Sequence, residues 1–161
     1  MPGIADSIAR LARGQAVPGP ESTRLTPLDD FGTNPGALLG HHYVPPGMAD
    51  PGALVVVLHG CTQTAAGYDL GSGWSTLAER HGFALLFPEQ QRRNNPNLCF
   101  NWFNPEDIRR DHGEALSIRQ MIGAMAARHP IDPARIYVTG LSAGGAMTSV
   151  CLLYTSPSPR D

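Results

Sequence analysis

Residues 54–58, with the sequence LVVVL, are apolar at every position and β-branched at three of them. A strand with one face in water carries polar residues at every second position. An unbroken apolar run is instead typical of a strand that is buried on both faces, inside a sheet that helices cover on both sides. This feature favours an α/β fold.

Further strand and helix patterns alternate along the chain. Residues 38–44 predict a first strand, and the apolar runs at 83–87 and 135–139 predict two more buried strands. Helical spacing predicts one helix over about 73–81 and a longer one over about 112–129. This alternation predicts a largely parallel sheet with flanking helices.

The longer helix has one apolar face, because Ile118, Met121, Ile122 and Met125 follow the i, i+3, i+4, i+7 pattern. Its start, Asp111-His112-Gly113-Glu114, has the form of a capping box with Asp in place of Ser or Thr. We therefore expect Glu114 to belong to the cap of this helix.

Charge and composition exclude several classes of protein. With 12 basic and 14 acidic residues the net charge is −2, so the chain has no basic excess with which to bind nucleic acid. The longest apolar run, residues 53–58, is far shorter than the ~20 residues of a membrane span. The histidines and cysteines show neither His-Glu-x-x-His nor Cys-x-x-Cys spacing, so we expect no metal site. No signal peptide is visible, and both a cytoplasmic and a secreted location stay open.

The sequence Gly140-Leu141-Ser142-Ala143-Gly144 fits the pattern G-x-S-x-G. It follows a predicted strand and precedes a predicted helix start at Ala143, which is the setting of a nucleophile elbow. The turn is tight, so the residues two before and two after the serine must be small. We interpret Ser142 as a nucleophile; the alternative is a glycine-rich turn with a helix-capping serine.

A serine nucleophile also needs backbone donors for the oxyanion. The N–H of Ala143 is one candidate, and the second is expected in the loop after the 54–58 strand. We expect Cys61 to supply that donor, with Thr62 as the alternative. His59 is expected to brace this loop rather than act in catalysis, because the triad histidine of this fold follows the serine in the chain.

A long loop over residues 88–111 reaches the same edge of the predicted sheet, where open α/β sheets bind ligands. Trp102 is its best candidate for a substrate contact, although its aromatic residues could equally pack the loop down. Cys99, in the same loop, could pair with Cys61 or with a cysteine elsewhere. The four loop arginines are expected to be solvated: Arg92, Arg93, Arg109 and Arg110.

Several motifs occur in a fixed order between about residues 40 and 150. They are His59-Gly60-Cys61-Thr62-Gln63-Thr64, Phe87-Pro88-Glu89-Gln90, Asn97-Leu98-Cys99-Phe100-Asn101-Trp102-Phe103, Gly113-Glu114 with Ser117-Ile118, and Gly140-Leu141-Ser142-Ala143-Gly144-Gly145-Ala146-Met147. Together they resemble the polyhydroxybutyrate depolymerase family of esterases, which is similar to the feruloyl and acetylxylan esterases.

The resemblance implies an α/β-hydrolase fold, of which this chain is expected to be an incomplete N-terminal part. It implies hydrolysis of carboxylic esters, short hydroxyalkanoates among them, by a Ser-Asp-His triad that includes Ser142 and needs no cofactor. The expected partner is a small or polymeric ester contacted by Trp102 and Thr62. No sequence feature indicates an oligomeric state.

The chain departs from this family after the elbow. All six histidines precede Ser142, and the only carboxylate side chain after it is Asp161. A serine without a base is a poor nucleophile at neutral pH. We therefore expect the chain alone to be inactive and marginally stable, with an open edge at its last strand.

Three segments are expected. Residues 1–35 form an N-terminal arm with a short helix over about 5–13, and residues 36–150 form part of the catalytic domain. Residues 151–161 can be back-translated to the transposase end of tagmentation sequencing adapters, and the prolines at 157 and 159 would end the last helix early. We interpret this tail as a translated adapter; the alternative is a natural Ser/Pro tail.

Two other functions compete with the depolymerase interpretation. One is a feruloyl or acetylxylan esterase on the same scaffold. The other is a non-catalytic α/β binding module in which Ser142 is only a turn residue.

Overall fold

The computed structural model describes residues 24–155 of the chain. The predicted helix at 5–13, most of the predicted arm and residues 156–161 of the predicted adapter lie outside this range. The described strands are β1 (Thr26–Pro27), β2 (Leu39–Tyr43), β3 (Gly52–Leu58), β4 (Ala84–Glu89) and β5 (Ile131–Gly140). The described helices are α2 (Ala65–Ser72), α3 (Trp74–His81), α4 (Pro105–Ile108), α5 (Gly113–Arg128) and α6 (Ala143–Thr155).

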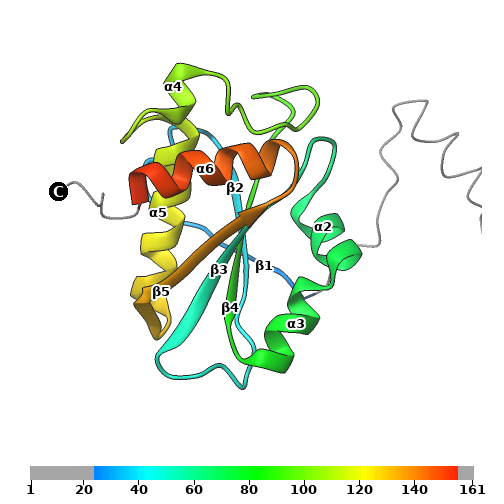
Figure 1. The fold of residues 1–161 in the computed structure, drawn as a ribbon, viewed down its shortest axis with the longest axis vertical. Coiled ribbons are helices and arrows are strands. Elements are labelled where there is room, and N and C mark those ends of the chain that lie inside the picture. Colours follow the sequence, from blue (N-terminus) through cyan, green and yellow to red (C-terminus); the bar gives the residue numbers. More distant parts are fainter. Residues whose placement is uncertain (1–23, 156–161) are drawn as a thin grey trace, which may run out of the picture.

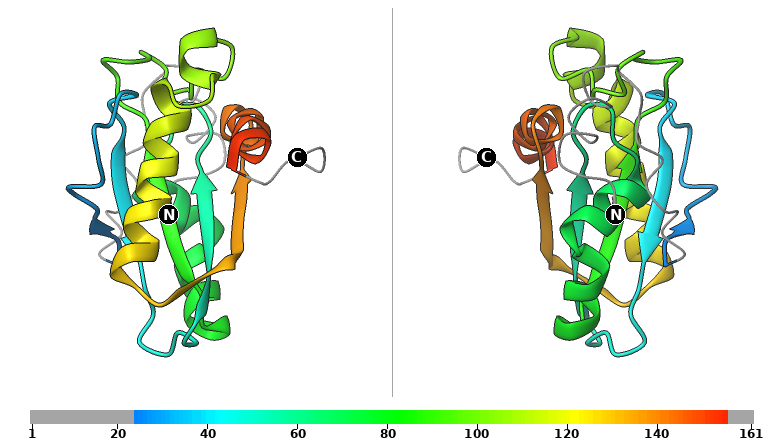
Figure 2. Two further views of the ribbon diagram at one scale, coloured as in Figure 1. Left: turned by 90° about the vertical axis from the view of Figure 1, so that its left-hand side faces the viewer. Right: turned by 90° about the vertical axis from the view of Figure 1, so that its right-hand side faces the viewer.

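The strands form one open sheet in the order β1-β2-β4-β3-β5, which Figure 2 shows from two sides. Strand β3 is parallel to both β4 and β5, as the apolar runs predict. The prediction of a largely parallel sheet is wrong for the other edge, because β2 is antiparallel to β4 and β1 to β2. Antiparallel edge strands are common on otherwise parallel sheets, and a single strand pattern such as that of β2 does not reveal its direction.

Helices cover both faces of the sheet, with α5 and α6 on one side and α2 and α3 on the other (Figure 1). Alternate residues of β3 divide between two core clusters: Leu54, Val56 and Leu58 pack with α5 and α6, whereas Val57 packs with α2 and α3. The prediction that this strand is buried on both faces is therefore confirmed.

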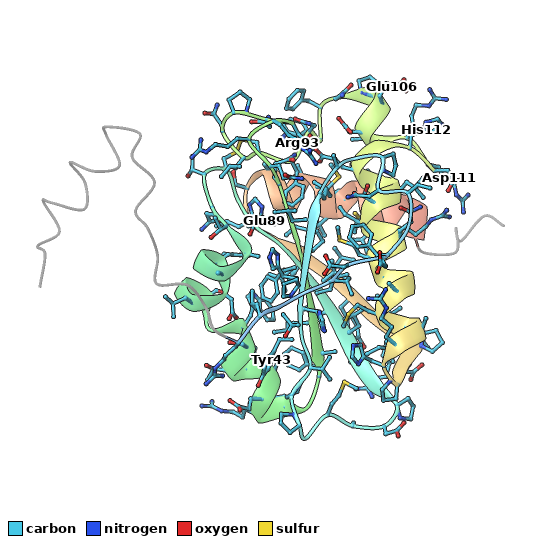
Figure 3. The ribbon with its side chains drawn as sticks, turned by 180° about the vertical axis from the view of Figure 1, so that it is seen from behind. Tyr43, Glu89, Arg93, Glu106, Asp111 and His112 are labelled. Atoms are coloured by element: carbon cyan, nitrogen blue, oxygen red, sulfur yellow. A yellow bond between two sulfur atoms is a disulfide. The ribbon has the colours of Figure 1, made fainter. Side chains whose placement is uncertain are left out.

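Helix α2 is absent from the sequence-based prediction. It begins after Thr64, whose Oγ1 accepts the Gly67 N–H at 3.1 Å, and its Ala65 N–H donates to Glu89 Oε2 at 2.5 Å. Figure 3 shows Glu89 on the side of the molecule that carries α2. The helix is short, and the carboxylate at its start comes from β4, so local spacing does not reveal it.

The start of α5 corrects a second prediction. The N-cap residue is His112, which makes no side-chain cap hydrogen bond, and the buried Glu114 side chain accepts its hydrogen bonds from Gln90 and Asn101. The predicted capping box is therefore wrong, because Gln90 and Asn101, which are distant in the sequence, donate hydrogen bonds to the Glu114 carboxylate.

Helix α6 corrects a third sequence-based prediction. It has 13 residues and reaches Thr155, and the side chain of Cys151 is buried in the core beside α5. The expectation that this helix ends early is wrong. The origin of residues 151–161 stays a prediction.

The described part of the chain, residues 24–155, offers neither a membrane span nor a metal site. No helix there is long and apolar enough to cross a membrane. That part of the chain also contains no group of three or more His, Cys, Asp or Glu side chains that could hold a metal ion.

Candidate active site

Ser142 lies in the turn between β5 and α6, and its backbone φ is +54°. A serine in this left-handed region is uncommon, and such strain is typical of functional sites. Hydrogen bonds fix the turn: the Leu141 N–H donates to Leu58 O at 3.1 Å, and the Gly144 N–H donates to Leu141 O at 2.9 Å. The turn has the geometry of a nucleophile elbow and exposes Ser142 at the surface.

The two glycines of the motif lie where the backbone segments approach most closely. A Cβ at Gly144 would overlap the carbonyl oxygens of Leu58 and His59, the second of them at 2.5 Å. A Cβ at Gly140 would overlap the backbone of Gly144. These contacts explain why both residues are small: Gly144 lies against the end of β3 and against His59, and Gly140 lies against Gly144.

The loop after β3 leaves the sheet beside the elbow. Leu58, the last residue of β3, is paired with Gly140, the last residue of β5. Thr62 has φ +65°, and its N–H donates to Asn97 O at 2.7 Å, so that amide is occupied. Within residues 24–155, the N–H groups of Cys61 and Ala143 donate no hydrogen bond. These two amides are therefore available to an incoming oxygen atom.

His59 braces this loop, as the sequence predicts. Its ring is buried against Phe100, with the ring centroids 4.8 Å apart. The Gln90 N–H donates to Nε2 at 3.0 Å, so Nε2 is unprotonated and Nδ1 donates to Gly60 O at 2.7 Å. Burial lowers the pKa of His59 and keeps the ring in this neutral form.

The hydrogen bond from His59 also orients the candidate oxyanion donor. The Gly60 C=O and the Cys61 N–H belong to one planar trans peptide and point in opposite directions. Holding the carbonyl at His59 therefore fixes the direction of the Cys61 N–H. The Gly60 N–H is held as well, by Gln63 Oε1 at 2.7 Å.

Glu114 is the functional candidate that sequence reasoning missed. Its carboxylate is fully buried and accepts Gln90 Nε2 at 2.5 Å and the Asn101 N–H at 2.9 Å. Burial raises its pKa to about 7, against the opposing effect of these hydrogen bonds. In the sequence, the position of Glu114 three residues after Asp111 fits a helix cap. Its hydrogen-bond partners Gln90 and Asn101 are 24 and 13 residues away, so only the fold brings them together.

We predict that the chain loses stability as the pH rises from about 4.5 to about 7. The pKa of Glu114 is about 7 in the fold and 4.5 as the reference, so the folded state binds more protons within this window. The stabilisation is complete below pH 4.5 and is lost as the pH passes 7; it amounts to about 3 kcal/mol. Urea unfolding at pH 5 and pH 8 measures it.

The variant Glu114→Gln should lose this part of the pH dependence, whereas Glu106→Gln, which changes an exposed glutamate on α4, should keep it. The same pH dependence in wild type and Glu114→Gln would contradict the assignment.

Cys61 and Cys99 form a disulfide, which decides between the pairings that the sequence leaves open. It joins the loop after β3 to the 88–111 loop. Gln90 Nε2 also donates to Cys99 O at 3.0 Å, so a covalent and a hydrogen-bonded link meet at one residue.

Reducing this disulfide should lower the free energy of unfolding by about 2–4 kcal/mol, because it closes a loop with a sequence separation of 38. Urea midpoints with and without reductant measure the change. The double variant Cys61→Ser/Cys99→Ser should already be destabilised and respond to reductant no further. Equal midpoints for the oxidised and reduced protein would contradict the prediction.

The aromatic residues of the 88–111 loop divide between two roles. Phe100 is buried against His59, whereas Trp102 and Phe103 are 46% and 60% exposed and touch edge to face. Packing of the loop therefore rests on Phe100, and Trp102 stays accessible to a ligand. The four loop arginines are exposed, as expected. Figure 3 shows Arg93 at the same end of the molecule as Glu106 and His112.

Comparison with known proteins identifies relatives of this chain. The profile of a family described as Esterase PHB depolymerase matches residues 38–158. Poly(3-hydroxyalkanoate) depolymerase C of Paucimonas lemoignei is 59% identical over 126 residues, which are 78% of this chain and 30% of that protein. Acetylxylan esterase A of Aspergillus oryzae is 32% identical over 81% of this chain and 42% of its own length. Feruloyl esterase B of Neurospora crassa is 33% identical over 78% of this chain and 42% of its own length.

Solved structures agree on the fold. An acetyl xylan esterase from Aspergillus awamori superposes with a TM-score of 0.74 at 30% identity, over 79% of this chain and 46% of that one. The poly(3-hydroxybutyrate) depolymerase LpqC from Bordetella parapertussis superposes with a TM-score of 0.60 at 22% identity, over 98% of this chain and 53% of that one. The chain spans less than half the length of the curated relatives it matches.

Proposed function

Because this chain belongs to the PHB depolymerase family of esterases, we propose that it carries the nucleophile and the oxyanion pocket of a carboxylic ester hydrolase. The observation that carries the proposal is the strained turn at Ser142, which lies beside two unoccupied backbone amides. An ordinary helix-capping serine does not require a left-handed backbone, since N-cap residues adopt extended angles.

In the proposed reaction, Ser142 Oγ attacks the carbonyl carbon of the ester and gives up its proton to a base. The carbonyl oxygen becomes an oxyanion, which accepts hydrogen bonds from the Cys61 and Ala143 N–H groups. Collapse of this intermediate expels the alcohol, which takes the proton back from the base, and leaves an acyl-serine. Water then hydrolyses the acyl-serine to the carboxylic acid and restores the Ser142 hydroxyl. Each such donor contributes about 10²–10³-fold to the rate in comparable enzymes.

The base and its carboxylate partner come, in this proposal, from sequence that follows the elbow. No histidine of the chain follows Ser142, and the curated relatives are more than twice as long as the region they share with it. The chain alone is then inactive, and assays need the product of the gene that includes the downstream residues, hereafter the complete gene product.

The proposed substrates are short hydroxyalkanoate esters, with Trp102 and Thr62 as contacts. The identity to poly(3-hydroxyalkanoate) depolymerase C favours this class. The similarity to acetylxylan and feruloyl esterases supports a second candidate, esters of plant polysaccharides. No nucleic acid or membrane partner is proposed.

Labelling and a substrate panel test the proposal. The complete gene product should react with a fluorophosphonate at Ser142 and hydrolyse 3-hydroxybutyrate oligomers faster than methyl ferulate or acetylated xylan. Labelling with the reverse substrate preference would favour the second candidate. A folded protein that stays unlabelled at Ser142 would support the binding module instead.

A further inference from the structure

We propose that Glu114 is a positioning residue of the oxyanion pocket: its ionised carboxylate, by accepting from Gln90 and Asn101 together, holds the loop after β3 and the aromatic loop in their working arrangement. This inference rests on the proposed function. It concerns a group that touches neither the substrate nor Ser142 in the proposed reaction.

The chain of contacts toward the pocket has three links. Glu114 accepts from the Gln90 side chain, and the Gln90 backbone N–H donates to His59 Nε2. His59 Nδ1 in turn holds Gly60 O, which fixes the direction of the Cys61 N–H. A displacement of Gln90 therefore reaches the candidate oxyanion donor through one imidazole ring.

A second branch leads to the aromatic loop. The other carboxylate oxygen of Glu114 accepts the N–H of Asn101, the residue directly before Trp102. Gln90 Nε2 also holds the carbonyl of Cys99, whose disulfide returns to Cys61. Both branches start at the same buried carboxylate.

The network requires two acceptors at position 114. The orientation of the Gln90 amide is already fixed, because its Oε1 accepts the Gln91 N–H and Asn94 Nδ2, both at 2.9 Å. Its Nε2 must therefore donate, and so must the Asn101 N–H. A glutamine at 114, or a protonated Glu114, would place a donor against one of these donors.

Protonation is within reach near neutral pH, since burial raises the pKa of Glu114 to about 7. Two titratable groups from neighbouring elements face it within residues 24–155. Asp107 on α4 accepts the Glu114 N–H at 3.3 Å and adds to the rise. The Cys151 thiol on α6 has its pKa raised to about 12, chiefly by burial, and stays neutral.

Stability and positioning should consequently respond to pH in opposite directions. Protonation favours the folded state over the unfolded chain, so stability falls as the pH rises through 7. The carboxylate alone satisfies both donors, so positioning improves over the same range. A residue with a merely structural role would move both properties together.

NMR of the ¹⁵N-labelled chain tests the contact independently of activity. In wild type, the amide resonances of Asn101 and Gln90 should shift with a common midpoint near pH 7. In Glu114→Gln they should stay flat between pH 5.5 and 8.5, whereas Glu106→Gln should titrate like wild type. Absence of a midpoint in wild type would overturn the proposal, even if the variant fails to fold.

Kinetics of the complete gene product give the second readout. Glu114→Gln should lower kcat by about 10-fold or more with a smaller change in KM, because the pocket is misplaced by a fraction of an ångström. The ratio of wild-type to variant kcat should rise between pH 6 and pH 8. Glu106→Gln should leave both parameters unchanged.

The outcomes separate the two proposals. Ester hydrolysis that Glu114→Gln leaves unchanged in kcat and pH profile overturns the role of Glu114 and leaves the proposed function standing. Absence of hydrolysis that depends on Ser142 in the wild-type protein overturns the proposed function, and with it the role of Glu114.

Discussion

Replacing Ser142 with alanine should lower kcat/KM for p-nitrophenyl butyrate by at least about 10⁴-fold in the complete gene product. In the proposed mechanism, alanine removes the Ser142 oxygen that forms the acyl intermediate, while the two proposed backbone donors remain. Steady-state hydrolysis across pH 6–9 measures the loss. The residual rate should equal that of water attack in the intact oxyanion pocket.

Ser149→Ala is the matched control, because Ser149 is an exposed serine on the same helix, α6. Its kinetic parameters should stay within twofold of wild type. A Ser142→Ala variant that retains most of its activity would show that Ser142 is a turn residue and that the nucleophile lies elsewhere.

Gly144→Ala should destabilise the folded chain by about 3 kcal/mol, which is the upper part of the usual range for overpacking a tightly packed site. The added Cβ would overlap the carbonyl oxygens of Leu58 and His59. Those atoms belong to β3 and to the loop that follows it, and they cannot move independently. The urea midpoint of the chain, measured by circular dichroism, gives the change without requiring activity.

Gly123→Ala provides the comparison. Gly123 is exposed on α5, and a Cβ there meets nothing within 4 Å. Alanine in a helix interior is favoured over glycine by about 1 kcal/mol, so this variant should gain stability. If Gly144→Ala were as stable as Gly123→Ala, helix α6 could not pack against β3 as described.

The sequence predicts the parts of this fold that local pattern determines. Residues 54–58 are apolar on both faces of their strand, and each face meets its own layer of helices. The G-x-S-x-G motif predicts the elbow, because the close approach at Gly144 admits no side chain. Burial and steric exclusion restrict which residue types can occupy neighbouring positions, so they produce local patterns that can be recognised in the sequence.

The features that sequence reasoning missed depend on partners far away in the chain. Glu114 has the spacing of a helix cap, and only the fold shows that Gln90 and Asn101 take its carboxylate. The antiparallel direction of β2 was missed for the same reason, and the sequence left open whether Cys99 pairs with Cys61 or with another cysteine. A pairing between distant residues leaves no periodic trace in the sequence.

The disulfide at the candidate oxyanion loop has a consequence for anyone who prepares this protein. Disulfides form in oxidising surroundings, whereas a reducing cytosol keeps thiols reduced. Two samples of identical sequence, expressed in different compartments, would therefore differ in covalent structure beside the atoms proposed to bind the oxyanion. The mass and activity of two preparations would have to be compared at a stated thiol content, because the oxidation state of Cys61 and Cys99 depends on where the protein was expressed.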